Sequence, residues 1–289
     1  MSGGDRRTLT PAGNRVSNCE ISNLSRHQHT YTPGVSIDGC GGLVLANEIY
    51  DIPSSAVHFT GNDMLIVSNR IHDVTWESDD QGGSDIYFDP SYAGCRFLFN
   101  SWTDVGKAWP HQSVGQAAMR FDGNVSGMTV YGNRITRCGT YMFGAVQMHG
   151  GRFNTVDNNL FIDCPGAISM AIYSREHWKK LWKELDLDTC TKKRVNILSE
   201  PYVRAYPWME TLEDSPQYNF FMRNVVVNGT LSKGKASEDT VRFGNVETEK
   251  MPDLGKLATR SLWHPLPEEK ALGPRPTAAF LRAKENDRR

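Results

Sequence analysis

Short stretches of alternating apolar and polar residues recur through the first half of the chain. Each is five residues long and ends at a glycine or a proline: VSIDG from Val35, VHFTG from Val57, IYFDP from Ile86, MRFDG from Met119 and VQMHG from Val146. Successive side chains of a strand point to opposite faces of its sheet, so one row should be buried and the other exposed. The residues expected to point inward are Val35 and Ile37, Val57 and Phe59, Ile86 and Phe88, Met119 and Phe121, and Val146 and Met148.

A second repeat begins with asparagine or a small residue and closes with apolar residues. Its copies are CEISNL from Cys19, NEIYDI from Asn47, NRIHDV from Asn69, NSWTDV from Asn100, NRITRC from Asn133, NLFIDC from Asn159 and NVVVNG from Asn224. Their starts lie 28, 22, 31, 33, 26 and 65 residues apart, which is too irregular for a helical solenoid but normal for β-coils with variable loops. The two repeats predict an all-β fold, a right-handed parallel β-helix (β-solenoid) whose coils stack about 4.8 Å apart. The asparagines should form a ladder inside the stack or at a corner.

The interval of 65 residues predicts an insertion of a different kind. Within residues 174–193, Trp178, Leu181, Trp182 and Leu185 follow the i, i+3, i+4, i+7 spacing of an amphipathic helix that packs over the coils. The proline-rich and aromatic stretch after it predicts a loop or short helix bordering a groove. The predicted division is a lead-in at 1–13, coils at 14–173, an insertion at 174–216 with its helix near 174–200, the last coil or coils at 217–248, and a C-terminal tail at 249–289.

Charge and composition narrow the classes of function. The 289 residues carry 32 Lys and Arg against 33 Asp and Glu, and a pI near 6.7 lacks the basic excess typical of nucleic-acid binding. No stretch approaches the roughly 18 apolar residues of a membrane span, and residues 1–22 lack the apolar segment of a signal peptide. Six scattered cysteines form no C-x-x-C pair, so we expect free thiols, with Cys138 and Cys164 stacked as small buried side chains.

Stacking turns the outward positions of successive strands into rows of neighbouring side chains. One expected row is Asp38, Thr60, Asp89, Asp122 and His149, and the next is Ser36, His58, Tyr87, Arg120 and Gln147. Neighbouring coils place carboxylates about 5 Å apart and alternate coils about 10 Å apart, which covers the separations used by retaining and inverting glycosidases. The second row offers groups that can bind sugar hydroxyls or a uronate carboxylate. The alternative interpretation is that these residues cap turns and face solvent.

Carboxylates are concentrated in one stretch, at Glu77, Asp79, Asp80, Asp85 and Asp89. Mutual repulsion should raise the pKa of some of them, as an acid catalyst requires. Calcium binding is the alternative, since clustered carboxylates also bind hard cations. The eight histidines have no zinc-binding spacing, so no metal site and no cofactor is assigned, with calcium left open.

Tryptophans outside the predicted core strands are candidates for stacking on sugar rings. Trp102 and Trp109 are the better candidates, whereas Trp178 and Trp182 are expected to pack the insertion against the coils. The candidate substrate-binding residues are therefore His58, Tyr87, Trp102, Trp109, Arg120 and His149.

Several longer motifs follow one another in a characteristic order. They are DDQGGSDIY, AMRFDGNVSGMTVYGN, GGRFNTVDNNLFIDC, a W-x-x-L helix, the pair Tyr206-Pro207 and WHPLPEEKALG, which together run from about Asn14 to Gly273. This order resembles that of right-handed β-helix proteins of the pectate-lyase-like superfamily, and within it the group around glycoside hydrolase family 141. The resemblance implies polysaccharide degradation and an extracellular or periplasmic location, with the chain beginning several coils into such a protein.

The same resemblance implies a catalytic pair of aspartates, which fall here on Asp80 and Asp122. The chain departs from the family pattern in two places. Gly82-Gly83-Ser84 lengthens the first motif, with Asp85 in place of alanine, and Gly123 replaces the second aspartate of the L-D-D motif. Asp85 or Asp89 is then a candidate for the missing role.

These observations together predict a glycoside hydrolase acting on a plant or algal polysaccharide through Asp122 and a partner among Asp80, Asp85 and Asp89. A polysaccharide lyase is the second hypothesis, with Arg120, His149 and the acidic stretch abstracting a proton and neutralising a uronate. A carbohydrate-binding β-helix without activity is the third.

Overall fold

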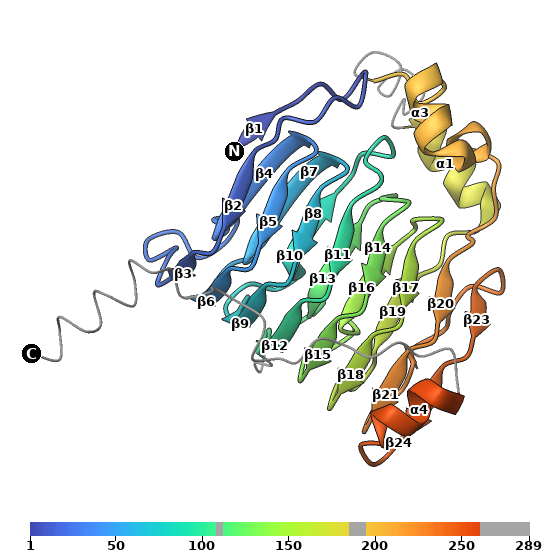
Figure 1. Ribbon diagram of the computed structural model, residues 1–289. Coiled ribbons are helices and arrows are strands. Elements are labelled where there is room, and N and C mark those ends of the chain that lie inside the picture. The colour runs from blue at the N-terminus through green and yellow to red at the C-terminus, as the bar shows by residue number, and fades with distance from the viewer. Residues whose placement is uncertain (108–111, 185–194, 261–289) are drawn as a thin grey trace, which may run out of the picture.

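Three parallel sheets of eight strands each wind into a right-handed parallel β-helix, as the sequence predicts (Figure 1). The computed structural model describes residues 1–107, 112–184 and 195–260, except for the side chains of Tyr87, Glu184 and 258–260. Sheet 1 consists of β1 (Ser2–Gly3), β4 (Val35–Cys40), β7 (Val57–Asn62), β10 (Gln81–Tyr87), β13 (Gln116–Asp122), β16 (Val146–His149), β19 (Ile168–Ala171) and β22 (Ser232–Lys233).

The other two sheets complete each coil. Sheet 2 consists of β2 (Arg15–Ser17), β5 (Leu43–Leu45), β8 (Leu65–Val67), β11 (Arg96–Leu98), β14 (Thr129–Tyr131), β17 (Thr155–Asp157), β20 (Phe220–Met222) and β23 (Val241–Phe243). Sheet 3 consists of β3 (Glu20–Ser22), β6 (Glu48–Ile52), β9 (Arg70–Val74), β12 (Ser101–Val105), β15 (Arg134–Thr136), β18 (Leu160–Ile162), β21 (Val225–Val227) and β24 (Val246–Thr248). Strands of one sheet lie beside strands one coil away, so residues about 20 to 65 positions apart become neighbours.

Apolar side chains fill the interior of the helix at the alternate positions that the sequence predicts. The expected inward residues of β4, β7, β13 and β16 are 0 to 5% exposed. In β10 the prediction is confirmed for Ile86, which is 0% exposed, but the register is shifted by two residues, so that Ser84 and Ile86 stand opposite Met119 and Phe121. Phe88 therefore lies beyond the strand, has a φ of 66° and is 41% exposed.

The small residues of β10 make room for a tryptophan in the core. Trp102 of β12 is fully buried in the main apolar cluster. A Cβ added to Gly83 would lie 2.8 Å from Val105 and 3.4 Å from the Trp102 ring. The sequence Gly82-Gly83-Ser84 thus lets an indole occupy the interior of this coil.

Asparagines at the bend from sheet 2 to sheet 3 form the predicted ladder. The Nδ2 atom of each donates a hydrogen bond of 2.9 or 3.0 Å to the Oδ1 atom of the next. The backbone N–H of each donates to the same Oδ1 atom. Each ladder asparagine follows a residue with positive φ, which turns the chain sharply from one sheet to the next. The ladder consists of Asn47, Asn69, Asn100, Asn133, Asn159, Asn224 and Asn245.

The insertion leaves the coils after β19 and covers the turns between sheets 1 and 2. It contains α1 (Arg175–Glu184), α3 (Glu200–Ala205) and the 3-10 helix η1 (Pro207–Thr211). Trp178 packs against the guanidinium of Arg152 at 3.5 Å, and Trp208 stacks on Phe153 at 5.2 Å. The Tyr202 hydroxyl donates a 2.9 Å hydrogen bond to Asn62. Trp178 and Trp182 are buried, as expected for residues that attach the insertion to the coils.

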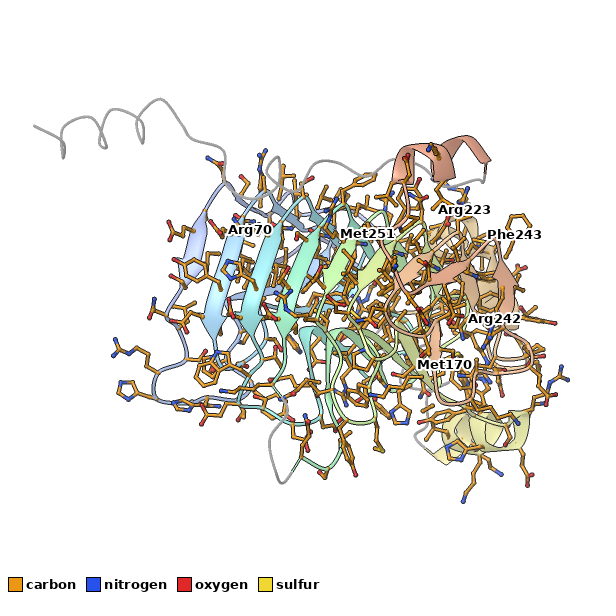
Figure 2. The ribbon with its side chains drawn as sticks, turned by 90° about the horizontal axis from the view of Figure 1, so that it is seen from below. Arg70, Met170, Arg223, Arg242, Phe243 and Met251 are labelled. Atoms are coloured by element: carbon orange, nitrogen blue, oxygen red, sulfur yellow. The ribbon has the colours of Figure 1, made fainter. Side chains whose placement is uncertain are left out.

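The C-terminal end of the described chain carries a short helix and several exposed apolar side chains. Helix α4 (Leu254–Arg260) packs Leu254 and Leu257 against apolar residues of β18 and β21. Figure 2 shows the side chains of the stack, with Phe243 and Met251 among those labelled near this end. Phe243 is 55% exposed and Met251 49%. Within the described residues, no helix is long and apolar enough to cross a membrane.

Candidate functional site

The candidate site lies on the outward face of sheet 1, where β10, β13 and β16 run side by side (Figure 1). Asp85 of β10 stands opposite Arg120 of β13, and Asp122 ends the same strand two residues later. His149 ends β16 one coil further on. Strand alternation places all four side chains on the outward face, because the residues between them fill the core.

Arg120 is the centre of this site and contacts three carboxylates. Its Nη2 atom donates to Asp80 Oδ1 at 2.8 Å and to Asp122 Oδ2 at 2.7 Å. Its Nη1 atom donates to Asp85 Oδ1 at 3.4 Å. The side chains of Asp80 and Asp122 are 52% and 19% exposed, whereas that of Asp85 is only 3% exposed. Asp80 and Asp122 are therefore the carboxylates that a ligand can reach.

Burial and neighbouring charges separate the carboxylates electrostatically. Burial raises the pKa of Asp85 to about 7, although Arg120 opposes this shift. Burial would also raise the pKa of Asp122, but hydrogen bonds and charges from His149 and Arg120 lower it below its ordinary value. The site thus holds one carboxyl that is protonated in mildly acidic solution and one that stays ionised.

A chain of hydrogen bonds leads from Asp122 to the insertion. His149 Nδ1 lies 2.5 Å from Asp122 Oδ1, and His149 Nε2 lies 2.9 Å from the Tyr173 hydroxyl. Tyr173 follows β19 and precedes α1, so the start of the insertion closes this side of the site. Burial raises the pKa of the Tyr173 hydroxyl, and the Asp122 charge adds to the shift. The alternating pattern does not mark Tyr173, because this residue lies outside the strands that carry the pattern.

The rows expected from the sequence need correction at β10. Register places Asp85 between His58 and Arg120, where Tyr87 was expected. The backbone of Tyr87 stands opposite Asp122, where Asp89 was expected, and its side chain lies outside the described part of the structure. A two-residue offset keeps the alternation intact, so the sequence pattern alone does not reveal it.

Asp89 does not lie in the outward row with Asp122 and His149. It is buried after β10, and its Oδ1 atom accepts hydrogen bonds from the Ser91 backbone N–H at 2.9 Å and from the Ser91 hydroxyl at 2.5 Å. Arg6 lies 4.0 Å from its other oxygen. Asp89 therefore holds a turn, as the alternative interpretation of such residues predicts.

Two tryptophans were predicted to bind substrate. The prediction is wrong for Trp102, which is 0% exposed in the core and has no surface to offer a sugar. Trp109 lies outside the described residues. His58, Arg120 and His149 do lie on the outward face of sheet 1, as expected.

The other acidic residues near β10 have separate structural partners. Burial would raise the pKa of Asp79, but the N–H groups of Ser113 and Gly115 and the Ser113 hydroxyl lower it to about 2. Glu77 forms an ion pair of 2.7 Å with His29. Among the residues that the structure describes, no group of three or more His, Cys, Asp or Glu side chains could hold a metal ion. These carboxylates therefore fix loops rather than form one cluster.

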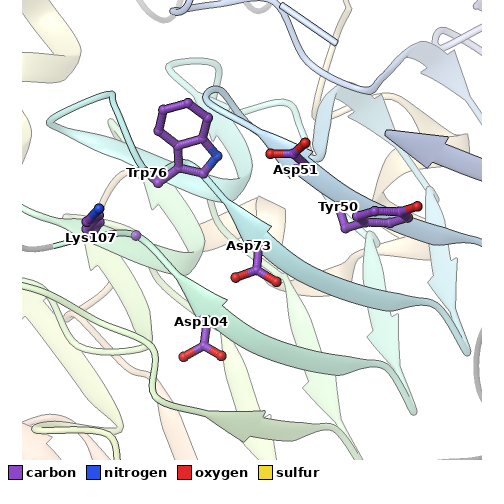
Figure 3. A pocket seen from close by; sticks show the side chains of 7 residues that line it. Tyr50, Asp51, Asp73, Trp76, Asp104 and Lys107 are labelled. Carbon is purple, nitrogen blue, oxygen red and sulfur yellow. The ribbon is translucent and has the colours of Figure 1, made fainter. Parts of the chain in front are cut away.

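Apart from the candidate site, a hollow of about 660 Å³ lies along sheet 3 (Figure 3). Three of its aspartates occupy successive strands, and the Arg137 guanidinium binds Asp104 at 2.7 and 2.6 Å. His72 lies 2.7 Å from Asp73. The hollow belongs to a different sheet from Arg120, so its carboxylates do not extend the candidate site. Its labelled residues are Tyr50, Asp51, Asp73, Trp76, Asp104 and Lys107.

Comparison with known proteins gives one match. A family model described as a right-handed β-helix region matches residues 8–176, more than half of the chain. No curated protein and no solved structure matches the chain significantly. The matched family is common to pectate lyases and glycosidases, which supports a carbohydrate-related role.

Proposed function

Because the chain belongs to the right-handed β-helix family, we propose that it is a carbohydrate-active enzyme, a retaining glycoside hydrolase whose carboxylates are Asp122 and Asp80. The group around glycoside hydrolase family 141 is the finer assignment that the motifs favour. The substrate class in this proposal is a plant or algal polysaccharide, and the resemblance favours an extracellular or periplasmic location.

One observation carries the proposal: Asp80 and Asp122 bind the same nitrogen of Arg120. The sum of the two distances, about 5.5 Å, is the largest separation that the two bound oxygens can have. Retaining enzymes hold their carboxyl groups about 5 to 5.5 Å apart, whereas inverting enzymes leave about 6.5 to 9.5 Å for a water molecule. The geometry therefore favours a covalent glycosyl-enzyme intermediate.

The lowered pKa of Asp122 and the exposure of Asp80 support one assignment of roles within the pair. Asp122 has a lowered pKa and stays ionised, so it is the nucleophile that attacks the anomeric carbon. Asp80 is the more exposed carboxyl, and it is assigned as the acid because a retaining mechanism needs a second carboxyl group to protonate the leaving oxygen. Once the bond to Asp122 has formed, Asp80 takes a proton from the water that releases the sugar. Asp85, buried behind Arg120, is a positioning residue that holds the guanidinium between the two carboxylates.

The overall charge of the site also favours hydrolysis of a neutral sugar. Three carboxyl groups surround a single guanidinium, so with Asp80 protonated as the acid and with Asp85 and Asp122 ionised the formal charge of the cluster is negative. A negative site stabilises the positive, oxocarbenium-like transition state of glycoside hydrolysis. It repels the carboxylate of a uronate, which a lyase has to bind and neutralise.

A polysaccharide lyase is the second candidate, and the bonded series Tyr173–His149–Asp122 favours it. A tyrosine can abstract a proton once its own hydroxyl proton has passed to a neighbouring imidazole, which a carboxylate orients and whose positive charge it stabilises. In this alternative Tyr173 is the base, and Arg120 binds the uronate in place of one of its present partners.

The test uses a panel of neutral and uronate polysaccharides, followed for reducing ends and ultraviolet absorbance together. A hydrolase releases reducing ends without absorbance, and proton NMR of the first product shows a retained anomeric configuration. Asp122→Asn and Asp80→Asn should each remove activity, while Asp38→Asn, in the same row three coils away, should not. New absorbance would establish the lyase instead, and silence in both readings would leave a binding protein without activity.

A further inference from the structure

A smaller hollow of about 340 Å³ lies beside the candidate site on the same side of the β-helix. His58 of β7, which lines it, stands opposite Asp85 in the neighbouring strand, and Asp85 contacts Arg120. The hollow thus lies over β4, β7 and the start of β10, in the coils immediately before Asp122. The lining residues used below are Tyr31, Ser36, Ser54, Ser55, His58 and Gln81.

Gln81 gives this hollow an unused hydrogen-bond acceptor. The residue is only 3% exposed, and within the described chain its Oε1 atom has no hydrogen-bond partner. A buried acceptor without a donor destabilises a fold unless a ligand or water supplies the donor. A ligand hydroxyl that enters the hollow would satisfy this oxygen.

The other lining groups are polar and uncharged. Ser55 is already bonded through its hydroxyl to Gly82 O at 2.6 Å, and Ser54 accepts from the backbone N–H of Thr32 at 3.2 Å. Burial lowers the pKa of His58, against the opposing charge of Asp38, so the imidazole is neutral at neutral pH. Among the described residues that line it, the hollow therefore offers no cation to pair with a carboxylate or sulfate.

An exposed aromatic ring completes the hollow. Tyr31 is 73% exposed, which leaves the faces of its ring available to a ligand. The combination of an aromatic face with hydroxyl, imidazole and amide groups suits a neutral sugar, whose C–H face is apolar and whose rim carries hydroxyls. An apolar ligand would leave Gln81 unsatisfied, and an anionic ligand would lack a counter-charge.

We propose that this hollow binds one neutral sugar unit of the polysaccharide, with a sugar hydroxyl donating to Gln81 Oε1 and the ring lying on Tyr31. The choice of a sugar rests on the proposed function. The bound chain then extends along the β-helix axis from Asp122 and Asp80 across β10 and β7 toward β4. The neutral lining makes this hollow a determinant of specificity against uronate polymers.

The experiment is calorimetric titration of the Asp122→Asn protein, which binds without turnover. The probes are hexaoses of β-glucose, xylose, mannose and galactose, with a galacturonate hexaose for comparison. We expect a neutral hexaose to bind, and Tyr31→Ala and Gln81→Met each to raise its Kd by about five- to tenfold. Tyr31 is exposed, so its variant folds even where a change at Gln81 does not. Phe243→Ala, which removes another exposed aromatic side chain, on the last coil, is the matched control and should bind like the parent.

The inference fails if only the galacturonate hexaose binds, if no neutral hexaose binds, or if Tyr31→Ala binds as the parent does. Its failure is separable from that of the proposed function. Binding that depends on Tyr31 without any reducing ends from the wild-type enzyme would support the hollow and refute the hydrolase. Hydrolysis with an unchanged KM in Tyr31→Ala would support the hydrolase and refute the hollow.

Discussion

Replacing Asn100 by alanine tests how much the asparagine ladder stabilises the β-helix. The Asn100 amide makes four side-chain hydrogen bonds, all buried. Its Oδ1 atom accepts from the backbone N–H and the Nδ2 atom of Asn69 at 2.9 and 3.0 Å. Its Nδ2 atom donates to Ile66 O at 2.9 Å and to Asn133 Oδ1 at 3.0 Å. Asn100→Ala removes all four.

The expected loss follows from these contacts. A neutral hydrogen bond contributes about 1 kcal/mol net, so four bonds correspond to about 4 kcal/mol of unfolding free energy. The backbone N–H of Asn69 also loses its ladder acceptor in a region that water does not reach, because Asn69 and Asn100 are both 0% exposed. A loss of this size is a large part of the stability of an ordinary domain.

Urea denaturation followed by tryptophan fluorescence measures the change. Asn14→Ala is the matched control because it removes a single exposed side-chain bond, to Ser2 O at 3.0 Å. We expect the control to cost less than about 1 kcal/mol. If Asn100→Ala is no more destabilising than Asn14→Ala, the ladder does not hold the coils together.

Three further perturbations test the site and the insertion. Asp85 has a native pKa of about 7 against 3.8 for the unfolded group, so the native state binds more protons between these values and the contribution of Asp85 to stability falls as the pH rises through them. Asp85→Asn should remove this contribution, about 3 kcal/mol, from the difference in unfolding free energy between pH 4.5 and pH 7.5, and an unchanged difference would show that Asp85 is not buried as a shifted acid. Tyr173→Phe keeps the ring contacts to His149 and His177 but removes the hydrogen bond from the hydroxyl to His149. Turnover should then fall less than about tenfold in a hydrolase, whereas a loss of about 100-fold or more would identify Tyr173 as the base of a lyase. Trp178→Ala removes a side chain that is 1% exposed, so it should lower the unfolding free energy by about 3 to 5 kcal/mol, and proteases should cleave the insertion before they cleave the coils. Cleavage of the insertion at the parental rate would contradict the packing.

The fold was predictable because two independent patterns agree in the sequence. Alternation at Val35 and Ile37 defines a buried row, and the recurring asparagines define one corner of each coil. Both patterns arise from side chains that occupy equivalent places in every coil, so the repeat is visible without any structure. The asparagine ladder forms as expected, even across the insertion.

The site was only partly predictable. Asp122, Arg120 and His149 come together as expected because they occupy outward positions of adjacent strands. The position of Asp85 depends on the register of β10, and a strand pattern with a period of two looks the same after a shift of two residues. Trp102 has a similar ambiguity, because an indole at the start of a strand can be a binding platform or a core residue. Only the glycines opposite it decide between the two.

The ladder bond from Asn159 to Asn224 spans 65 residues, yet its length of 3.0 Å equals that of the bond from Asn47 to Asn69, which spans 22. Stacking is therefore independent of how much chain leaves a coil between two ladder positions. Segments at this turn can lengthen or shorten while the row of candidate groups on sheet 1 keeps its spacing. For protein engineering, the insertion is then a place where the wall beside Asp122 and His149 can be redesigned while the carboxylates of sheet 1 stay in register.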